Sequence, residues 1–210
     1  MNPLFNPKVK ERTVSTLASH VAALKTDNKY KILLFGDSIF ERLNEYPCFQ
    51  ELAATYSIFN GSVGGDGIEH MLYRAKEGFP SLFPDNLETI ILLAGTNNIE
   101  RYDENKVFAG FLNLLNVIKS QRNVKIIILG LPPRFSSTKK ISDDKIMTRV
   151  KNYNKLLSGV SDCQYHDFSS KLLNDGSQPD RKFFVDHVHF SDLGYEQFMN
   201  CLTNVITSIE

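Results

Sequence analysis

Three short polar sequences each follow an apolar run that predicts a buried strand. Gly-Asp-Ser occupies residues 36–38, Gly-Gly-Asp residues 64–66 and Gly-Thr-Asn residues 95–97. Because the carboxyl ends of parallel strands meet at one edge of a sheet, these polar groups are expected to lie close together. The hydroxyl of Ser38 is therefore the first candidate for a nucleophile. Backbone N–H groups of the glycine-rich loop are candidates for stabilising a developing negative charge.

A fourth polar sequence, Asp-His-Val-His at residues 186–189, supplies a candidate base. Asp186 and His189 are three residues apart, and in a helical turn or compact loop this spacing places both side chains on one side. A hydroxyl is a weak nucleophile until a base takes its proton, and a carboxylate improves that base by fixing its tautomer. Ser38, His189 and Asp186 thus have the residue types of a serine-hydrolase triad.

Each of these groups alone also has a purely structural interpretation. Ser38 could cap a helix, the glycines could form a tight turn, and Asn97 could bond to its own backbone. His189 could be an ordinary packed or exposed histidine ahead of a helix, and Asp37 could only brace the turn that presents Ser38. The occurrence of three polar sequences at the ends of successive strands favours a catalytic role over these structural interpretations.

Other kinds of site fit the sequence less well. The loop at residues 60–67 contains neither Gly-x-x-x-x-Gly-Lys nor Gly-x-Gly-x-x-Gly opening a helix, which disfavours nucleotide binding. Asp186, His187 and His189 could instead bind a metal, but a metallophosphoesterase would need a further carboxylate and histidine beside the strand ends. The Gly-x-Ser-x-Gly elbow of α/β-hydrolases would need glycine where Phe40 stands.

Four histidines besides His189 are expected to stand outside the site. His20 and His70 lie on predicted helices, and His166 has only a neighbouring aspartate. His187 is expected to point away from His189.

The polar sequences need a scaffold in which strands and helices alternate. A polar surface loop is predicted at residues 134–143, and Asp103 is a candidate helix cap. Apolar runs predict strands at residues 31–36, 56–59, 87–94, 124–129 and 164–168. Apolar residues at helical spacing predict helices over residues 8–26, 40–55, 68–76, 103–118 and 145–157, and from Ser191 onward. This alternation indicates a largely parallel sheet covered by helices on both faces.

Size and charge limit the classes of protein to consider. The 210 residues fit a single domain, residues 1–210. Lys plus Arg and Asp plus Glu are both 24, and no block of like charge indicates a nucleic-acid partner. Three scattered cysteines argue against a disulfide framework. The first residues lack the apolar core of a signal peptide and no run is long enough to span a membrane, so a soluble, cytoplasmic protein is expected.

In their order along the chain, the four polar sequences resemble the sequence blocks of the SGNH (GDSL-type) hydrolase family. Within that family the chain is most similar to the catalytic α subunits of intracellular platelet-activating-factor acetylhydrolase, through residues 60–67, 95–98 and 129–134. Ile39 stands where the family's name motif has leucine. That difference is expected to affect packing rather than chemistry.

The resemblance implies a fold and a set of roles. The fold is a three-layer α/β/α sandwich, flavodoxin-like, with a central sheet of about five parallel strands. Ser38 becomes the nucleophile, His189 the general base and then acid, and Asp186 the residue that orients it. The backbone N–H groups of Ser38 and Gly65 and the side-chain amide of Asn97 become the oxyanion hole. No metal or cofactor is expected.

The activity that the resemblance implies is a serine esterase, a carboxylic ester hydrolase that forms an acyl-enzyme. Its substrate would be a small ester with a short acyl group, most simply an acetylated lipid or sugar. Two alternatives stay open: a carbohydrate O-acetylesterase, and a catalytically silent binding or scaffold module on the same fold. A homodimer is a further possibility.

Overall fold

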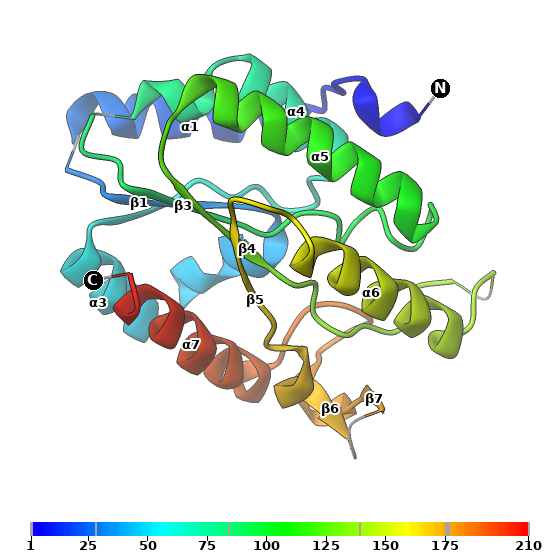
Figure 1. The fold of residues 1–210 in the computed structure, drawn as a ribbon. Helices are drawn as coiled ribbons and strands as arrows, with labels where there is room; N and C mark the ends of the chain where they lie inside the picture. Colours follow the sequence, from blue (N-terminus) through cyan, green and yellow to red (C-terminus); the bar gives the residue numbers. More distant parts are fainter. Residues whose placement is uncertain (1, 28, 84, 139, 175–176, 210) are drawn as a thin grey trace.

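A parallel sheet of five strands lies at the centre of the computed structural model, in the order β2-β1-β3-β4-β5 (Figure 1). The structure describes residues 2–27, 29–83, 85–138, 140–174 and 177–209. The predicted strands are confirmed, each within a few residues of its expected ends. They are β1 (Ile32–Phe35), β2 (Ile58–Asn60), β3 (Thr89–Leu92), β4 (Lys125–Leu129) and β5 (Gln164–His166).

Helices cover both faces of this sheet, which confirms the three-layer α/β/α sandwich. Over one face lie α1 (Glu11–Thr26), α4 (Ile68–Lys76), α5 (Glu104–Gln121) and α6 (Asp143–Ser158). Over the other lie α2 (Ser38–Glu41), α3 (Pro47–Tyr56) and α7 (Asp192–Thr207). Among the described residues no helix is both long and apolar enough to cross a membrane.

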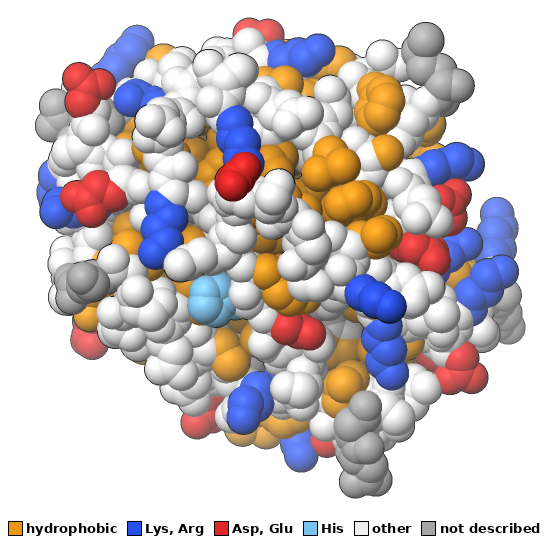
Figure 2. Space-filling model, viewed as in Figure 1, with side chains coloured by type: hydrophobic (Ala, Val, Ile, Leu, Met, Phe, Trp, Pro, Cys, Tyr) orange, Lys and Arg blue, Asp and Glu red, His pale blue; other side chains and the backbone are white. Residues whose placement is uncertain are grey.

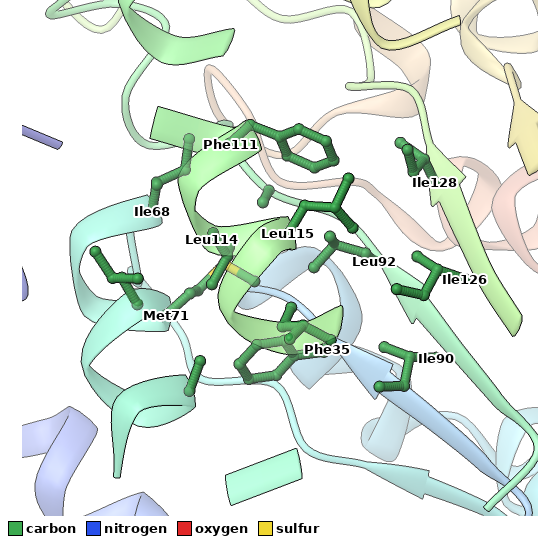
Figure 3. Close-up of a cluster of buried hydrophobic side chains, with 14 of the residues drawn as sticks. Phe35, Ile68, Met71, Ile90, Leu92, Phe111, Leu114, Leu115, Ile126 and Ile128 are labelled. Carbon is green, nitrogen blue, oxygen red and sulfur yellow. The ribbon is translucent and has the colours of Figure 1, made fainter. Parts of the chain in front are cut away.

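Each strand contributes alternate side chains to two apolar cores. Leu33 of β1 packs in the core beneath α4, α5 and α6, whereas its neighbour Leu34 packs in the core beneath α2, α3 and α7. Figure 3 shows part of the first core, where Phe111 and Leu115 of α5 lie over Leu92 and its neighbours in the sheet. Burial on both faces explains why the strands read as continuous apolar runs.

Some predicted elements differ from those observed. The helix expected over residues 40–55 is broken into α2, a 3-10 turn (Arg42–Glu45) and α3, because Pro47 lacks an N–H and suits the first position of a new helix. Val14, one of the apolar residues whose helical spacing predicts the helix over residues 8–26, is 40% exposed. A small antiparallel pair, β6 (Leu173–Asn174) and β7 (Gln178–Pro179), was not expected. Asp103 does cap α5, accepting from Lys106 N at 2.9 Å.

The loop at residues 134–143 is not wholly a surface loop, and that prediction is wrong for its start. Arg134 and Phe135 are 3% and 7% exposed. Arg134 can be buried because it donates to the carbonyl oxygen of Thr96 at 2.6 Å and to Oε2 of Glu100 at 2.9 Å. The loop after β4 is thereby attached to the loop after β3.

A second buried arginine joins the loops that follow β1 and β2. Arg74 of α4 is fully buried, and its Nε donates to Oδ2 of Asp66 at 2.9 Å. Its terminal N–H groups donate to the carbonyl oxygens of Gly61 and Gly36, and its guanidinium lies 4.4 Å from the centre of the Phe35 ring. A buried cation is stable only when it is paired and hydrogen-bonded, so Arg74 holds these loops in one arrangement.

The same cluster extends to the loop after β3. Asn98 Oδ1 accepts from the backbone N–H of Ile68 at 2.9 Å, and its Nδ2 donates to Oε2 of the buried Glu69 at 2.7 Å. The other oxygen of Asp66 accepts from Thr13 Oγ1 at 2.6 Å. All three strand-end loops are therefore connected through α4, by Arg74 in its last turn and by Ile68 and Glu69 in its first.

Removing the Arg74 guanidinium should be strongly destabilising. We expect Arg74→Met to lower the free energy of unfolding by about 3 kcal/mol, because Oδ2 of the buried Asp66 and the carbonyl oxygens of Gly61 and Gly36 lose their donor, while Lys10 still pairs with Oδ1 of Asp66 at 3.0 Å. The matched control is Lys31→Met, which breaks the 3.0 Å pair between Lys31 and Glu88, two side chains that are 54% and 57% exposed. That change should cost less than about 1 kcal/mol. Urea unfolding measures both, and equal losses would contradict the role given to Arg74.

Candidate active site

Ser38, His189 and Asp186 form a continuous chain of hydrogen bonds. Nε2 of His189 lies 2.9 Å from Oγ of Ser38, and Nδ1 lies 2.7 Å from Oδ2 of Asp186. Oδ1 of Asp186 accepts from the backbone N–H groups of Val188 and His189, both at 2.8 Å. With the proton on Nδ1, the ring donates to the carboxylate and leaves Nε2 to accept from the hydroxyl.

The surroundings of Asp186 keep it ionised. Partial burial works against the charge, but hydrogen bonds from the backbone and ring of His189 and from the backbone of Val188 hold the pKa of the Asp186 carboxyl well below its ordinary value. A carboxylate that stays charged can stabilise the imidazolium that forms when His189 takes a proton.

Ser38 is presented by a sharp turn between β1 and α2. A Cβ atom at Gly36 would lie 3.0 Å from the carbonyl oxygen of Leu93, so the chain leaves β1 in close contact with the next strand. Asp37 caps α2 by accepting from the Ile39 N–H at 3.0 Å. The structural interpretation of Asp37 as a brace therefore agrees with its contacts, and Ser38 is the first residue of the helix.

His189 is held by a compact loop before α7. Phe184 and Phe190 pair across this loop as an antiparallel bridge, and the N–H of Val185 donates to the carbonyl oxygen of His189 at 2.9 Å. The closed loop explains how a spacing of three residues brings Asp186 and His189 together outside a helix.

The predicted oxyanion-hole groups lie around the same groove as Ser38. Gly65, Asn97 and His189 line this groove of about 450 Å³ with Ser38. No acceptor among the described residues takes the N–H of Ser38 or of Gly65. Asn97 Nδ2 donates to the carbonyl oxygen of Asp66 at 2.9 Å, which fixes the amide and leaves its second N–H available. The structure thus brings all five predicted site residues together.

The expectation that His187 stands outside the site is wrong. His187 lines the groove beside His189, and its Nδ1 lies 4.0 Å from Oδ1 of Asp186, because the loop turns tightly enough to bring both rings to one side. Two of the other histidines, His20 and His70, make structural contacts, as expected. His20 packs against Phe59 and Phe79, where burial lowers its pKa to about 4, and Nδ1 of His70 accepts from Gly67 N at 3.0 Å.

Metal binding at residues 186–189 gains no support from the side chains. In the part of the chain that the structure describes, no three His, Cys, Asp or Glu residues converge as metal ligands would. Asp186 Oδ2 and His189 Nδ1 bond to each other instead.

Two residues that support the site, Arg74 and Arg134, were not identified from the sequence. On α4, Arg74 follows Met71 by three residues and so shares its buried side, which is the one signal that could have revealed it. Arg134 comes shortly after a buried strand, where an unpaired charge would be costly. Neither the helical spacing of Arg74 nor the position of Arg134 after a strand distinguishes a buried arginine from an exposed one, and exposed arginines are far commoner.

The carboxyl of Asp37 is fully buried directly behind Ser38. Its Oδ1 accepts from Ile39 N, while Oδ2 has no partner among the described residues. Burial raises the pKa of Asp37 from 3.8 to about 6. The folded protein therefore binds this proton more tightly than the unfolded chain, and the stability due to the proton is lost as the pH rises from about 4 to about 6.

Replacing Asp37 by asparagine should remove this pH dependence while keeping the acceptor for Ile39. We expect the free energy of unfolding of Asp37→Asn, relative to the wild type, to increase by about 2 kcal/mol between pH 4 and pH 7. Asp103→Asn is the control, because Asp103 caps α5 from a half-buried position and the backbone N–H of Lys106 lowers its pKa. Urea unfolding across this pH range measures both. A constant difference for Asp37→Asn would show that Asp37 does not titrate in that range.

Comparison with known proteins identifies relatives of the chain. Residues 34–197 match the model of the GDSL-like Lipase/Acylhydrolase family, a segment that contains all four polar sequences. Over 186 residues, 87% of this chain and 79% of the relative, the chain is 27% identical to the α2 subunit of platelet-activating factor acetylhydrolase IB from Rattus norvegicus. It is 34% identical to the α2 subunit from Homo sapiens over 110 residues, 51% of this chain and 46% of the relative.

Solved structures share the fold. A candidate acylhydrolase from Bacteroides fragilis superposes with a TM-score of 0.77 at 19% identity, covering 96% of this chain and 99% of that one. A mutant of an acetyl-xylooligosaccharide esterase from Geobacillus gives a TM-score of 0.63 at 15% identity, covering 86% and 96%. These identities support the fold, and the family model supports the relationship. The chain belongs to the GDSL-like lipase/acylhydrolase family, whose members are hydrolases that act on esters.

Proposed function

We propose that this chain is a serine esterase that hydrolyses short-chain acyl esters, acetyl esters in the first place. The observation that carries the proposal is the unbroken hydrogen-bond chain from Asp186 through His189 to the Ser38 hydroxyl. A hydroxyl in this setting is an activated nucleophile.

The first half of the reaction forms an acyl-enzyme. His189 Nε2 takes the proton from Ser38 as Oγ attacks the ester carbonyl carbon, and Asp186 stabilises the imidazolium. The carbonyl oxygen becomes an oxyanion, which accepts from the N–H groups of Ser38 and Gly65 and from the amide of Asn97. The tetrahedral intermediate then collapses, the alcohol oxygen takes the proton from His189 and leaves, and the acyl group remains on Ser38 Oγ.

The second half releases the acyl group. His189 takes a proton from a water molecule, whose oxygen attacks the acyl carbonyl carbon and forms a second oxyanion in the same place. Collapse breaks the bond to Ser38 Oγ, which recovers its proton from His189. One ester and one water give one alcohol and one carboxylic acid.

The lining of the groove supports a short acyl group. Of the described residues that line it, Val188 is the only aliphatic one, and the rest are glycines or polar side chains. A long acyl chain would find little apolar surface there, and burial of such surface is what favours long chains. The name of the 27% identical relative, an acetylhydrolase subunit, points the same way. An acetyl-xylooligosaccharide esterase shares the fold, so an acetylated sugar remains the alternative substrate proposed for this chain.

Removing the nucleophile should abolish turnover without unfolding the protein. We expect Ser38→Ala to reduce the hydrolysis of p-nitrophenyl acetate by a factor of about 10⁴ or more, at an unchanged Tm. Ser158→Ala, at an exposed serine on α6, is the control and should be fully active. An organophosphonate should label the wild type and the control but not Ser38→Ala, and chelators should have no effect. A silent scaffold would show neither turnover nor labelling, and an active Ser38→Ala would place the nucleophile elsewhere.

The acyl-length preference is testable with one series of substrates. From p-nitrophenyl acetate through butyrate to octanoate, kcat/KM should fall steadily, because the polar groove offers no surface to added methylene groups. A maximum at octanoate would overturn the short-chain assignment while leaving the esterase intact.

A further inference from the structure

A second pocket adjoins the catalytic groove and is strongly basic. It has a volume of about 560 Å³, and Asn97 and His187 line both it and the groove. It is built from the loop after β3, the loop at residues 134–143 and the start of α6. Figure 2 shows Lys and Arg side chains at the right-hand edge of the molecule, over the start of α6 and the loop before it. The cationic residues that line the pocket are Arg101, Arg134, Lys140, Lys145 and Arg149.

Only one carboxylate, Glu100, is among the described residues that line this pocket, and it is already saturated. Its Oε2 accepts from Arg134 at 2.9 Å and from Ser137 Oγ at 2.7 Å. Its Oε1 accepts from Ser136 Oγ at 3.0 Å and from Ser137 N at 2.8 Å. Glu100 therefore neutralises Arg134 and has no capacity left for the other cations.

The remaining four cations have no ion pair with any described carboxylate. Arg101 donates to the carbonyl oxygen of Asn97 at 2.8 Å, and Arg149 donates to that of Glu100 at 3.0 Å. Lys140 and Lys145 are exposed. In a chain with equal numbers of acidic and basic residues, this is a local excess of positive charge.

The acidic residues at the start of α6 do not cancel that excess by direct pairing. Asp143 Oδ1 accepts from the backbone N–H of Ser136 at 2.7 Å. Asp144 Oδ1 accepts from Gln178 Nε2 at 2.7 Å, and neither residue lines the pocket.

We propose that this basic pocket binds an oxyanion, a phosphomonoester or a carboxylate, carried by the alcohol half of the ester. The inference rests on the proposed function and narrows its substrate class to small anionic acyl esters. Unpaired Arg and Lys side chains attract such groups, and the guanidinium can bind them with parallel hydrogen bonds. Ile141 is the one aliphatic residue among those described in the lining, so an alkyl chain would gain little there.

The shared residues indicate how such a substrate lies. With its carbonyl carbon at Ser38 Oγ, the alcohol half extends past Asn97 and His187 into the basic pocket. The acyl group then lies toward the end of the groove lined by Glu41 and Glu45. Because the anion is bound before and after attack, its contribution is mainly to substrate affinity and orientation.

The test compares esters that differ only in charge. One pair is 1-acetylglycerol 3-phosphate against 1-acetylglycerol, and a second is 4-acetoxybutanoate against 4-acetoxybutan-1-ol. The wild type should prefer at least one anionic ester over its neutral partner by about tenfold or more in kcat/KM, and the preference should shrink at high salt. The pair with the larger ratio of kcat/KM values shows whether the pocket prefers a phosphomonoester or a carboxylate. Equal kcat/KM values within both pairs would overturn the proposal.

Substitution of two lysines of the pocket tests whether the preference for anionic esters arises there. Lys140→Gln combined with Lys145→Gln should remove most of the preference and leave kcat/KM for the neutral esters unchanged. Lys151→Gln combined with Lys155→Gln, two exposed positions on the same helix outside the pocket, is the matched control. A preference that survives the first double change would also overturn the proposal.

Binding to the inactive protein separates this inference from the proposed function. Calorimetric titration of Ser38→Ala with inorganic phosphate and with 4-acetoxybutanoate measures the pocket without turnover. Binding that weakens several-fold when Lys140 and Lys145 are replaced supports the pocket even if Ser38 is not the nucleophile. Absence of binding by both anions, in a protein whose wild type hydrolyses p-nitrophenyl acetate, contradicts the pocket and leaves the esterase in place.

Discussion

The burial of Arg74 beside Asp66 is the constraint on which the site depends. Burial lowers the pKa of Arg74 to about 10, so the side chain is charged at neutral pH and needs acceptors. Those acceptors are the Asp66 carboxylate and the carbonyl oxygens of Gly36 and Gly61, from the loops that carry Ser38 and Gly65. Movement of either loop would break bonds to a buried charge. Arg74 thus fixes the relative positions of Ser38 and the Gly65 N–H, although it contacts neither of them.

Arg134 fixes the position of the loop after β3, as Arg74 fixes the loops after β1 and β2. It donates to the carbonyl oxygen of Thr96, next to Asn97, while Asn97 itself donates to the backbone of Asp66. The amide of Asn97 is therefore fixed from two directions before any substrate arrives. Donors that need no rearrangement stabilise a developing oxyanion better than mobile ones. The two buried arginines make the site rigid, and the strand ends alone would not.

The alternation of apolar runs and amphipathic segments was enough to predict the layers of the fold, because each face of a buried strand must be covered. Ser38, Asp186 and His189 could be predicted since their residue types and spacings belong to known chemistry. Arg74 could not, because a buried arginine on an amphipathic helix has the same spacing as an exposed one. The position of His187 depended on a loop closed by the Phe184 and Phe190 bridge, which has no local sequence pattern.

The charges around the groove are arranged unequally at its two ends, and this has a consequence for substrate orientation. Beyond Ser38 the lining pairs acids with bases, as in the 2.7 Å contact between Arg12 and Glu41. Beyond Asn97 the described residues that line the pocket include five cations and one carboxylate, Glu100. A neutral ester would experience little difference between the ends. An anionic one would be attracted to the second end, because at the first end Arg12 and Arg42 balance Glu41 and Glu45. In the proposed reaction, charge asymmetry rather than the shape of an apolar channel would then decide which half of the ester lies toward α6.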